Sequence, residues 1–254
     1  MTTTLELPSQ PTAAAHTRAD TPAAAAAATP RVDLYAAVHK GLRLFMTDTL
    51  ARVGRLDVGD DDEIKATLGQ LDTLLSICRS HLGHENEFVH TAIEARQPGG
   101  SMRIEGEHEE HLSAIAALAS DAAALRALPT AAAAQRLYRR LAIFVAENLQ
   151  HMDVEETAHN AALWSAYTDL ELMAIHERLL ASIEPAEMAT SLRWMVPAMS
   201  PAERAGMLGG MATQMPPEAM REVLAKVRAL LDDRAWAKLA RALNLPPVPG
   251  LVAV

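Results

Sequence analysis

The chain has 254 residues and a formal net charge of −9, a balance that disfavours surfaces for nucleic acid or anionic membranes. The sequence contains no apolar run of about 18 residues, so no membrane span is expected. Half of the residues are hydrophobic, only 4% are aromatic and alanine is abundant, which favours closely packed helices over sheets.

The first part of the chain predicts a leader followed by four helices. Residues 1–30 are rich in Thr, Pro and Ala without apolar periodicity, and we expect a disordered leader. The inner face of the third helix is predicted to hold Ile104, Leu112 and Ile115. Short connections favour an up-and-down four-helix bundle, which we assign to 31–167. The apolar spacing predicts its helices over about 32–53, 61–96, 101–128 and 130–165.

The remainder, 168–254, predicts additional C-terminal helices and completes an all-α fold. Thr168 can cap a helix, and Ser200 begins a capping box. Pro185, Pro201 and Pro217 each stand where a helix can start. Methionines are frequent here and are expected to fill packing gaps, with a thioether metal site as the alternative. We expect this region to pack on the bundle or to form a homodimer.

Histidines and glutamates recur at matched positions of the four predicted helices. Two helices carry His-x-x-x-Glu, which places an imidazole and a carboxylate on one face, one turn apart. At about 1.5 Å per residue along alternating helices, the four histidine groups fall near one level. Buried glutamates without a cation would be costly, so we predict a metal site. The candidate ligands are His39, His81, Glu85, His108, His111, His151 and Glu155.

These segments resemble the motifs of the hemerythrin-like family, also called HHE cation-binding domains, over about 32–165. The resemblance implies a non-haem di-iron centre in an up-and-down bundle, with Glu85 and Glu155 bridging the two irons. It also implies that the protein binds or senses oxygen or nitric oxide, senses iron, or handles peroxide. The matching residues are His39 in Val-His-Lys-Gly-Leu-Arg, His81 and Glu85 in His-Leu-Gly-His-Glu-Asn-Glu, His108 in Gly-Glu-His-Glu-Glu-His, and His151 and Glu155 in His-Met-Asp-Val-Glu-Glu.

The sequence departs from the oxygen-carrying members of that family in two places. Those members have His-x-x-x-His on the third helix and an Asp after the last His. Here His108 and His111 are three apart, and Glu155 replaces the Asp. These changes disfavour simple reversible oxygen carriage, because an added carboxylate favours oxidised iron. Either His108 or His111 could be the ligand, or both, and His84 is expected either to orient a ligand or to serve as an alternative ligand.

Side chains that orient the ligands are also expected. A ligating histidine usually donates its other ring N–H to a carboxylate or carbonyl. Glu107, Glu147 and Glu156 are the candidates for this role. Tyr35 lies one turn before His39 and either points its hydroxyl at the site or packs at the helix start.

Other patterns were weighed against the His-x-x-x-Glu frame. A ferritin-like site would use Glu87-x-x-His90, Glu105-x-x-His108 and Glu156-x-x-His159, but the first helix offers no inward Glu. Zinc is a chemical alternative, although a mixed His and carboxylate set across four helices suits iron better. Cys78, the single cysteine, is expected to be a small buried hydrophobe, with a redox-sensitive thiol as the alternative. Its lack of a disulfide partner fits a cytoplasmic protein.

The sequence leaves three functions open. The first is a protein that binds or senses a small diatomic ligand or iron at a di-iron centre. The second is a di-iron enzyme acting on peroxide, oxygen or nitric oxide. The third is a metal-free helical interaction module. The ligand residues do not separate the first two.

Overall fold

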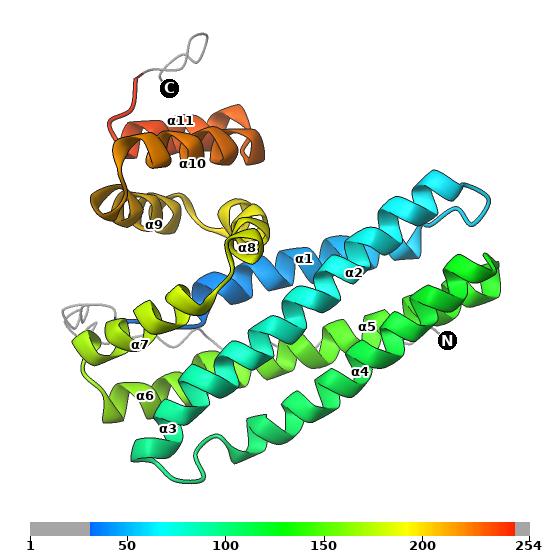
Figure 1. The fold of residues 1–254 in the computed structure, drawn as a ribbon, viewed down its shortest axis with the longest axis horizontal. Coiled ribbons are helices and arrows are strands. Elements are labelled where there is room, and N and C mark those ends of the chain that lie inside the picture. The colour runs from blue at the N-terminus through cyan, green and yellow to red at the C-terminus, as the bar shows by residue number, and fades with distance from the viewer. Residues whose placement is uncertain (1–30, 247–254) are drawn as a thin grey trace, which may run out of the picture. The chain divides into compact units, whose positions relative to one another are not determined.

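The computed structural model describes residues 31–246, and that part of the chain is helical without strands (Figure 1). The predicted all-α fold class is confirmed. The expected leader, 1–30, lies outside the described residues, as do 247–254. Two helices of the bundle contain a π-helical turn, labelled η. The bundle consists of α1 (Ala36–Gly54), α2 (Asp61–His84) with η1 (Glu85–His90) and α3 (Thr91–Arg96), α4 (Met102–Ala127), and α5 (Ala131–Val154) with η2 (Glu155–His159) and α6 (Asn160–Ala166).

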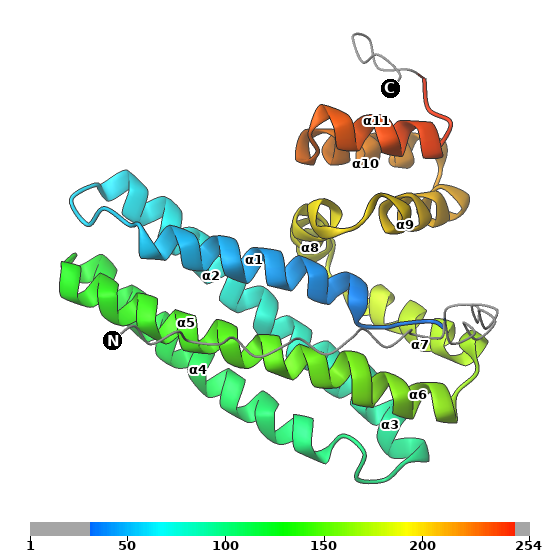
Figure 2. The same ribbon diagram turned by 180° about the vertical axis from the view of Figure 1, so that it is seen from behind.

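The four long helical segments form a closed ring of neighbours. Helix α1 packs against α2 and α5, and α4 packs against the same two helices. Successive segments run side by side in alternating directions, as both views show (Figures 1 and 2). This is the up-and-down arrangement expected for segments joined by short connections.

Local capping explains where the helices begin. Asp60 accepts a hydrogen bond from the backbone N–H of Glu63 and caps α2. Thr130 does the same for α5 by accepting from the N–H of Ala133. The turn between α3 and α4 contains Gly99 at φ +84°, a conformation that glycine adopts at little cost. These caps and turns place the boundaries within a few residues of the predicted ones.

Two apolar clusters fill the bundle, one at each end. The larger one lies toward the α1–α2 and α4–α5 connections and includes Phe45, Leu71 and Leu118. The smaller one, at the opposite end, includes Val89 and Leu163. Between them lies a layer of buried histidines and glutamates. Leu112, predicted to face inward on the third helix, instead lies 37% exposed.

The C-terminal helices start where the sequence predicted. Thr168 and Ser200 each form a capping box with the glutamate three residues on. Pro185, Pro201 and Pro217 are the first residues of their helices. None of the described helices is long and apolar enough to cross a membrane. The helices are α7 (Asp169–Ser182), α8 (Pro185–Ala198), α9 (Pro201–Gln214), α10 (Pro217–Leu230) and α11 (Asp233–Ala242).

Helix α8 packs directly on α1. The ring of Trp194 stacks on that of Phe45, with centroids 4.1 Å apart and planes 10° from parallel. Gly41 lets the two helices approach, because a Cβ added there would lie 2.7 Å from Met195 Cγ and 3.0 Å from its backbone nitrogen. Helix α8 thus packs on the helix that carries His39, while Leu172 and Ile175 of α7 join the smaller apolar cluster.

We expect Gly41→Ala to destabilise the protein. The new methyl group would overlap both the side chain and the backbone of Met195, so the helices must move apart. Overpacking of this kind costs about 1–3 kcal/mol of unfolding free energy. Urea unfolding followed by circular dichroism measures the change.

Gly69→Ala is the matched control. Gly69 is exposed within α2, and a Cβ there meets nothing within 4 Å. Alanine in an exposed helix interior should raise the unfolding free energy by about 0.5–1 kcal/mol. An equal gain from Gly41→Ala would mean that α8 does not pack tightly on α1.

Candidate metal centre

The buried polar layer is built around two π-helical turns at corresponding places in the bundle. Glu85 begins η1 and Glu155 begins η2, each four residues after a histidine. An α-helix advances about 100° per residue, so a residue five positions after Glu85 would lie about 140° away around the axis. The wider turn of η1 returns His90 to the inner face, where it is 5% exposed. π-turns of this kind occur frequently at functional sites.

The first group of potential ligands is formed by His39, His81 and Glu85. Oε1 of Glu85 lies 3.1 Å from Nε2 of His81 and 3.4 Å from Nε2 of His39. The ligand atoms of the three residues lie within 4.8 Å of one another. Two imidazoles and a carboxylate therefore converge from α1 and from the junction of α2 and η1.

The second group is formed by His108, His151, Glu155 and Glu85. Nε2 of His151 lies 3.3 Å from Oε1 of Glu155, and Nε2 of His108 lies 3.6 Å from the same oxygen. The two histidine Nε2 atoms are 3.1 Å apart. This group draws on α4, α5 and η2, so all four bundle segments contribute to the two groups. We call the six residues of both groups the His/Glu cluster.

Each glutamate of the cluster faces both groups. Glu85 directs Oε1 to the first group and Oε2 to His108, at 3.6 Å from Nε2. Glu155 directs Oε1 to the second group and Oε2 to His39, at 3.5 Å from Nε2. Two carboxylates that each span a pair of ligand groups have the arrangement needed to bridge two metal ions.

Six of the eight inner ligand atoms of the cluster have no hydrogen-bond partner among the described residues. This holds for both carboxylate oxygens of Glu85 and Glu155 and for Nε2 of His39 and His81. Both glutamates are at most 3% exposed. An unsatisfied buried polar group costs about 1–3 kcal/mol, and more when it is charged. Metal coordination removes this cost, so the donor set fits a cation held between the helices.

The outer nitrogens of three of the four cluster histidines are held by hydrogen bonds. Nδ1 of His39 lies 3.0 Å from Oε1 of Glu156, and Nδ1 of His108 lies 2.7 Å from Oδ1 of Asn86. Such contacts fix the ring orientation and leave Nε2 as the nitrogen that faces inward. Glu156 was predicted for this role, whereas Asn86 was missed because an exposed Asn inside a helix gives no sequence signal.

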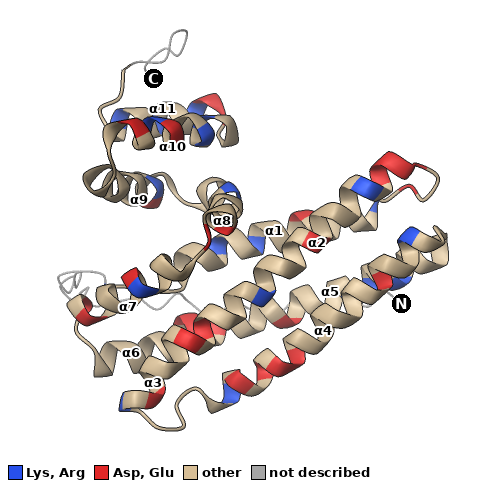
Figure 3. Cartoon of the chain, in the orientation of Figure 1, with Lys and Arg blue, Asp and Glu red and all other residues tan. Residues whose placement is uncertain are grey.

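Glu107, a second predicted partner, holds His151. Its Oε2 lies 2.9 Å from Nδ1 of His151, while its other oxygen accepts from Nε of Arg103 at 3.0 Å. Glu107 belongs to an acidic stretch of α4 that is visible in Figure 3. A local excess of negative charge raises the concentration of cations near the site. The other acidic residues of this stretch are Glu105, Glu109 and Glu110.

The electrostatic state of the cluster follows from burial and from these contacts. Burial alone would lower the pKa of His39, but the hydrogen bond with Glu156 and the close approach of Glu85 outweigh it and raise the pKa to about 9. Burial works against the ionised form of Glu85, but the nearby imidazoles of His81 and His39 hold its pKa well below the usual range. Burial and the nearby Glu85 act to raise the pKa of Glu155, but the imidazoles of His108 and His151 outweigh them and lower it. Both carboxylates are therefore ionised and His39 is a cation when metal is absent.

A third group of potential ligands lies beside the cluster and consists of His90, Glu155 and His159. Both histidines belong to the alternative ferritin-like pattern and were not among the predicted ligands of the His-x-x-x-Glu pattern. The sequence signal for them is a second histidine that follows each His-x-x-x-Glu pair. His90 lies five residues after Glu85, and His159 lies four residues after Glu155. Tyr35, which lies before α1, places its hydroxyl 3.1 Å from Nδ1 of His159. Its hydroxyl thus points into the polar layer at this neighbour of the cluster, while its ring packs against His39 with centroids 5.3 Å apart.

The remaining predicted residues lie outside the three ligand groups. His111 is 4% exposed and packs edge-on against His151, with ring centroids 4.7 Å apart. Of the two candidates on the third helix, His108 is therefore the one whose ligand atom joins a group. His84 is half-buried and turns toward α8, with Nδ1 3.8 Å from Oε1 of Glu187. Neither residue is part of the groups found among the described residues.

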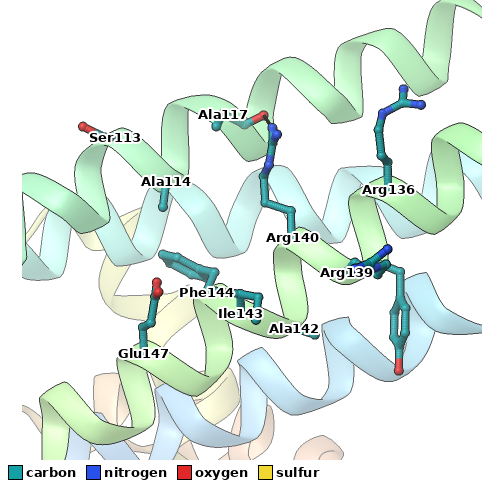
Figure 4. Close-up of a pocket in the computed structure, with 11 residues that line it drawn as sticks. Ser113, Ala114, Ala117, Arg136, Arg139, Arg140, Ala142, Ile143, Phe144 and Glu147 are labelled. Atoms are coloured by element: carbon teal, nitrogen blue, oxygen red, sulfur yellow. Dashed lines mark hydrogen bonds between the residues drawn. The ribbon is translucent and has the colours of Figure 1, made fainter.

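A surface groove between α4 and α5 is separate from the cluster (Figure 4). Arg140 donates a hydrogen bond to the carbonyl of Ala117 across it, at 3.3 Å. Glu147, predicted to hold a ligating histidine, lines this groove instead. None of the predicted metal ligands is among the residues that line the groove, so the groove is not part of the metal centre.

The metal-free protein should lose stability as the pH rises. The pKa of His39 is raised from 6.5 to about 9, so its contribution is fully present below 6.5 and is lost as the pH passes 9. A shift of this size corresponds to roughly 3 kcal/mol. Urea unfolding of chelator-treated protein across this range measures it, and His39→Gln should flatten the profile. A wild-type profile as flat as that of the variant would show that His39 carries no proton in the fold.

Comparison of the chain with family models, curated proteins and solved structures finds no match in any of the three. The case for a function therefore rests on the positions and chemistry of the cluster residues.

Proposed function

We propose that this chain is a hemerythrin-like, non-haem di-iron protein that binds or senses a small ligand at the His/Glu cluster. The proposal rests on the position of two carboxylates. Glu85 and Glu155 each direct one oxygen to the first group of histidines and the other oxygen to the second group. These four oxygens have no hydrogen-bond partner in the described part of the chain. A single metal ion would leave part of this set unsatisfied. Two ions bridged by the carboxylates would use all of it.

The donor set favours iron over other metals. Four imidazole nitrogens and two carboxylates offer mixed N and O ligands without a thiolate, because Cys78 belongs to the apolar cluster. Structural zinc sites are usually closed tetrahedra with four ligands, often including cysteine. Histidine and carboxylate ligands with positions left open are typical of non-haem iron.

Burial restricts what can reach the metals. His39, His108, His151 and both glutamates are at most 4% exposed, and only the His81 side chain, at 15%, approaches the surface. A site this enclosed admits small molecules such as oxygen, nitric oxide or peroxide more readily than an organic substrate. Bound iron would supply redox chemistry and open coordination positions for such a ligand.

The chain's own contribution is to hold and orient the ligands. Glu156 and Glu107 accept from the outer Nδ1 atoms of His39 and His151, which keeps Nε2 of each ring directed inward. Arg43 anchors Glu156 through a contact of 2.5 Å to the oxygen that His39 uses. Metal binding must displace the proton on His39, so affinity is expected to rise with pH.

Metal content and the visible absorption spectrum of protein expressed with iron test the proposal first. We expect two irons per chain with near-ultraviolet bands of an oxo-bridged pair. His81→Ala should lower the iron content, whereas His84→Ala, three residues on and outside the ligand groups, should not change it. Unchanged metal content and stability in a His81→Ala/His151→Ala double variant would instead support a metal-free interaction module.

Addition of oxygen, nitric oxide and peroxide to the iron-loaded protein then separates binding from catalysis. A stable spectral complex without turnover is the expected result for a binding or sensing protein. Sustained consumption of peroxide, oxygen or nitric oxide would assign the chain to the di-iron enzymes instead. Both outcomes require the cluster, and His81→Ala should abolish either of them.

Glu156→Ala should weaken metal binding without removing a ligand. Loss of the acceptor for His39 Nδ1 leaves the ring free to turn, and substitutions of this kind typically lower metal affinity about 10–100-fold. Competition with a chelator of known affinity measures the change. Glu147→Ala, on the adjoining helix α5 and exposed, is the control and should bind as the wild type does. Equal affinities of the two variants would exclude this role for Glu156.

A further inference from the structure

The third group, His90, His159 and Glu155, is not used by the two-metal centre apart from its shared carboxylate. His90 and His159 are the last residues of η1 and η2. The π-turn returns His90 to the inner face, whereas His159, four residues after Glu155, lies on the face of Glu155 by ordinary helix periodicity. The three side chains are 5%, 3% and 0% exposed, and their ligand atoms lie within 4.8 Å of one another. A buried, convergent set of this kind needs a physical explanation.

His90 has no hydrogen-bond partner for either ring nitrogen within residues 31–246. Its ring stacks on that of His108, with centroids 4.8 Å apart and planes at 21°, and meets His159 edge-on at 5.3 Å. A buried imidazole with two unsatisfied nitrogens is unfavourable, because each lost hydrogen bond to water is not replaced. A leucine would fill the same space without this penalty, so packing alone does not account for a histidine here.

His159 is oriented in the same way as the cluster histidines. The hydroxyl of Tyr35, itself 1% exposed, lies 3.1 Å from Nδ1 of His159. This contact occupies the outer nitrogen and leaves Nε2 for a ligand, as the bonds to Glu156 and Asn86 do for His39 and His108. The division into an inner and an outer nitrogen is the arrangement that metal-binding histidines show in general.

We propose that His90, His159 and Glu155 form a third metal position, which takes a single divalent transition-metal ion such as iron(II), manganese or cobalt. Two imidazoles and one carboxylate are the ligand set of mononuclear non-haem iron sites, with further positions left open. The proposal rests on the proposed two-metal centre only in that Glu155 is shared between them.

Charge determines the order of filling. Glu85 and Glu155 supply two negative charges, which offset part of the charge of two divalent ions. A third divalent ion close by is repelled by the first two and receives a share of one carboxylate only. The third position should therefore fill last, with an affinity at least about tenfold lower than that of the first two.

Titration of the full-length, metal-free protein with cobalt(II) tests the proposal, because cobalt gives visible bands that report each bound ion and its ligands. Equilibrium dialysis with metal analysis gives the stoichiometry. We expect two tight equivalents and a third, weaker one in the wild type. The His90→Ala/His159→Ala double variant should lose the third equivalent and keep the two tight ones, which also shows that it folds.

Two further variants sharpen the assignment. His84→Ala/His176→Ala removes two half-buried histidines outside the three groups and should retain all three equivalents. Tyr35→Phe removes only the hydroxyl that holds His159 and should weaken the third equivalent by about tenfold. A wild type that binds no third cobalt at millimolar concentration overturns the proposal, as does a third equivalent that survives in His90→Ala/His159→Ala.

Failure of the two-metal centre is distinguishable from failure of the third position. Loss of the tight equivalents is expected in His81→Ala/His151→Ala, and their absence from the wild type would overturn the proposed function. The weak equivalent is read separately, from the difference between His90→Ala/His159→Ala and the His84→Ala/His176→Ala control. A difference of one equivalent supports the third position whatever the tight sites do.

Discussion

The burial of two carboxylates at the centre of the bundle is the constraint on which the rest of this structure depends. Glu85 and Glu155 are ionised and almost fully enclosed, and their oxygens have no hydrogen-bond partner within the described chain. Desolvation of an isolated carboxylate is too costly for a stable fold unless positive charge compensates it. In the metal-free protein His39 supplies part of that charge as an imidazolium. Two metal ions would supply it more completely, and would replace a proton in doing so.

The two apolar clusters on either side exclude water from this polar layer. Leu71, Leu118 and their neighbours close it from one end, and Val89 and Leu163 from the other. The layer therefore has a low local dielectric, in which charge interactions are strong and misplaced charges are costly. Three of the four cluster histidines have an outer hydrogen-bond partner, which fixes the orientation of the ring in this enclosed layer. Asn86, Glu107 and Glu156 each form a hydrogen bond with a buried histidine of a neighbouring helical segment.

Much of the arrangement could be predicted from the sequence, because helix periodicity and capping are local. The levels of His39, His81, His108 and His151 follow from counting residues along alternating helices. The π-turns could not be predicted, since the widened turn at Glu85 depends on tertiary contacts that override local propensity. That turn decides that His90 faces inward. The prediction that Leu112 faces inward was wrong. On α4 the neighbouring His111 takes the inward position, and Leu112 is 37% exposed.

Helix α1 has two tasks that lie two residues apart. His39 is its contribution to the His/Glu cluster, and Gly41 is the point at which Met195 of α8 meets its backbone. A helix is stiff over so short a length, so its rotational setting cannot differ between these two contacts. A rotation of α1 that changes the position of the His39 ring therefore also changes the position at which α8 packs on α1. Helix α1 thus couples the packing of α8 at Gly41 to the position of the buried His39 side chain.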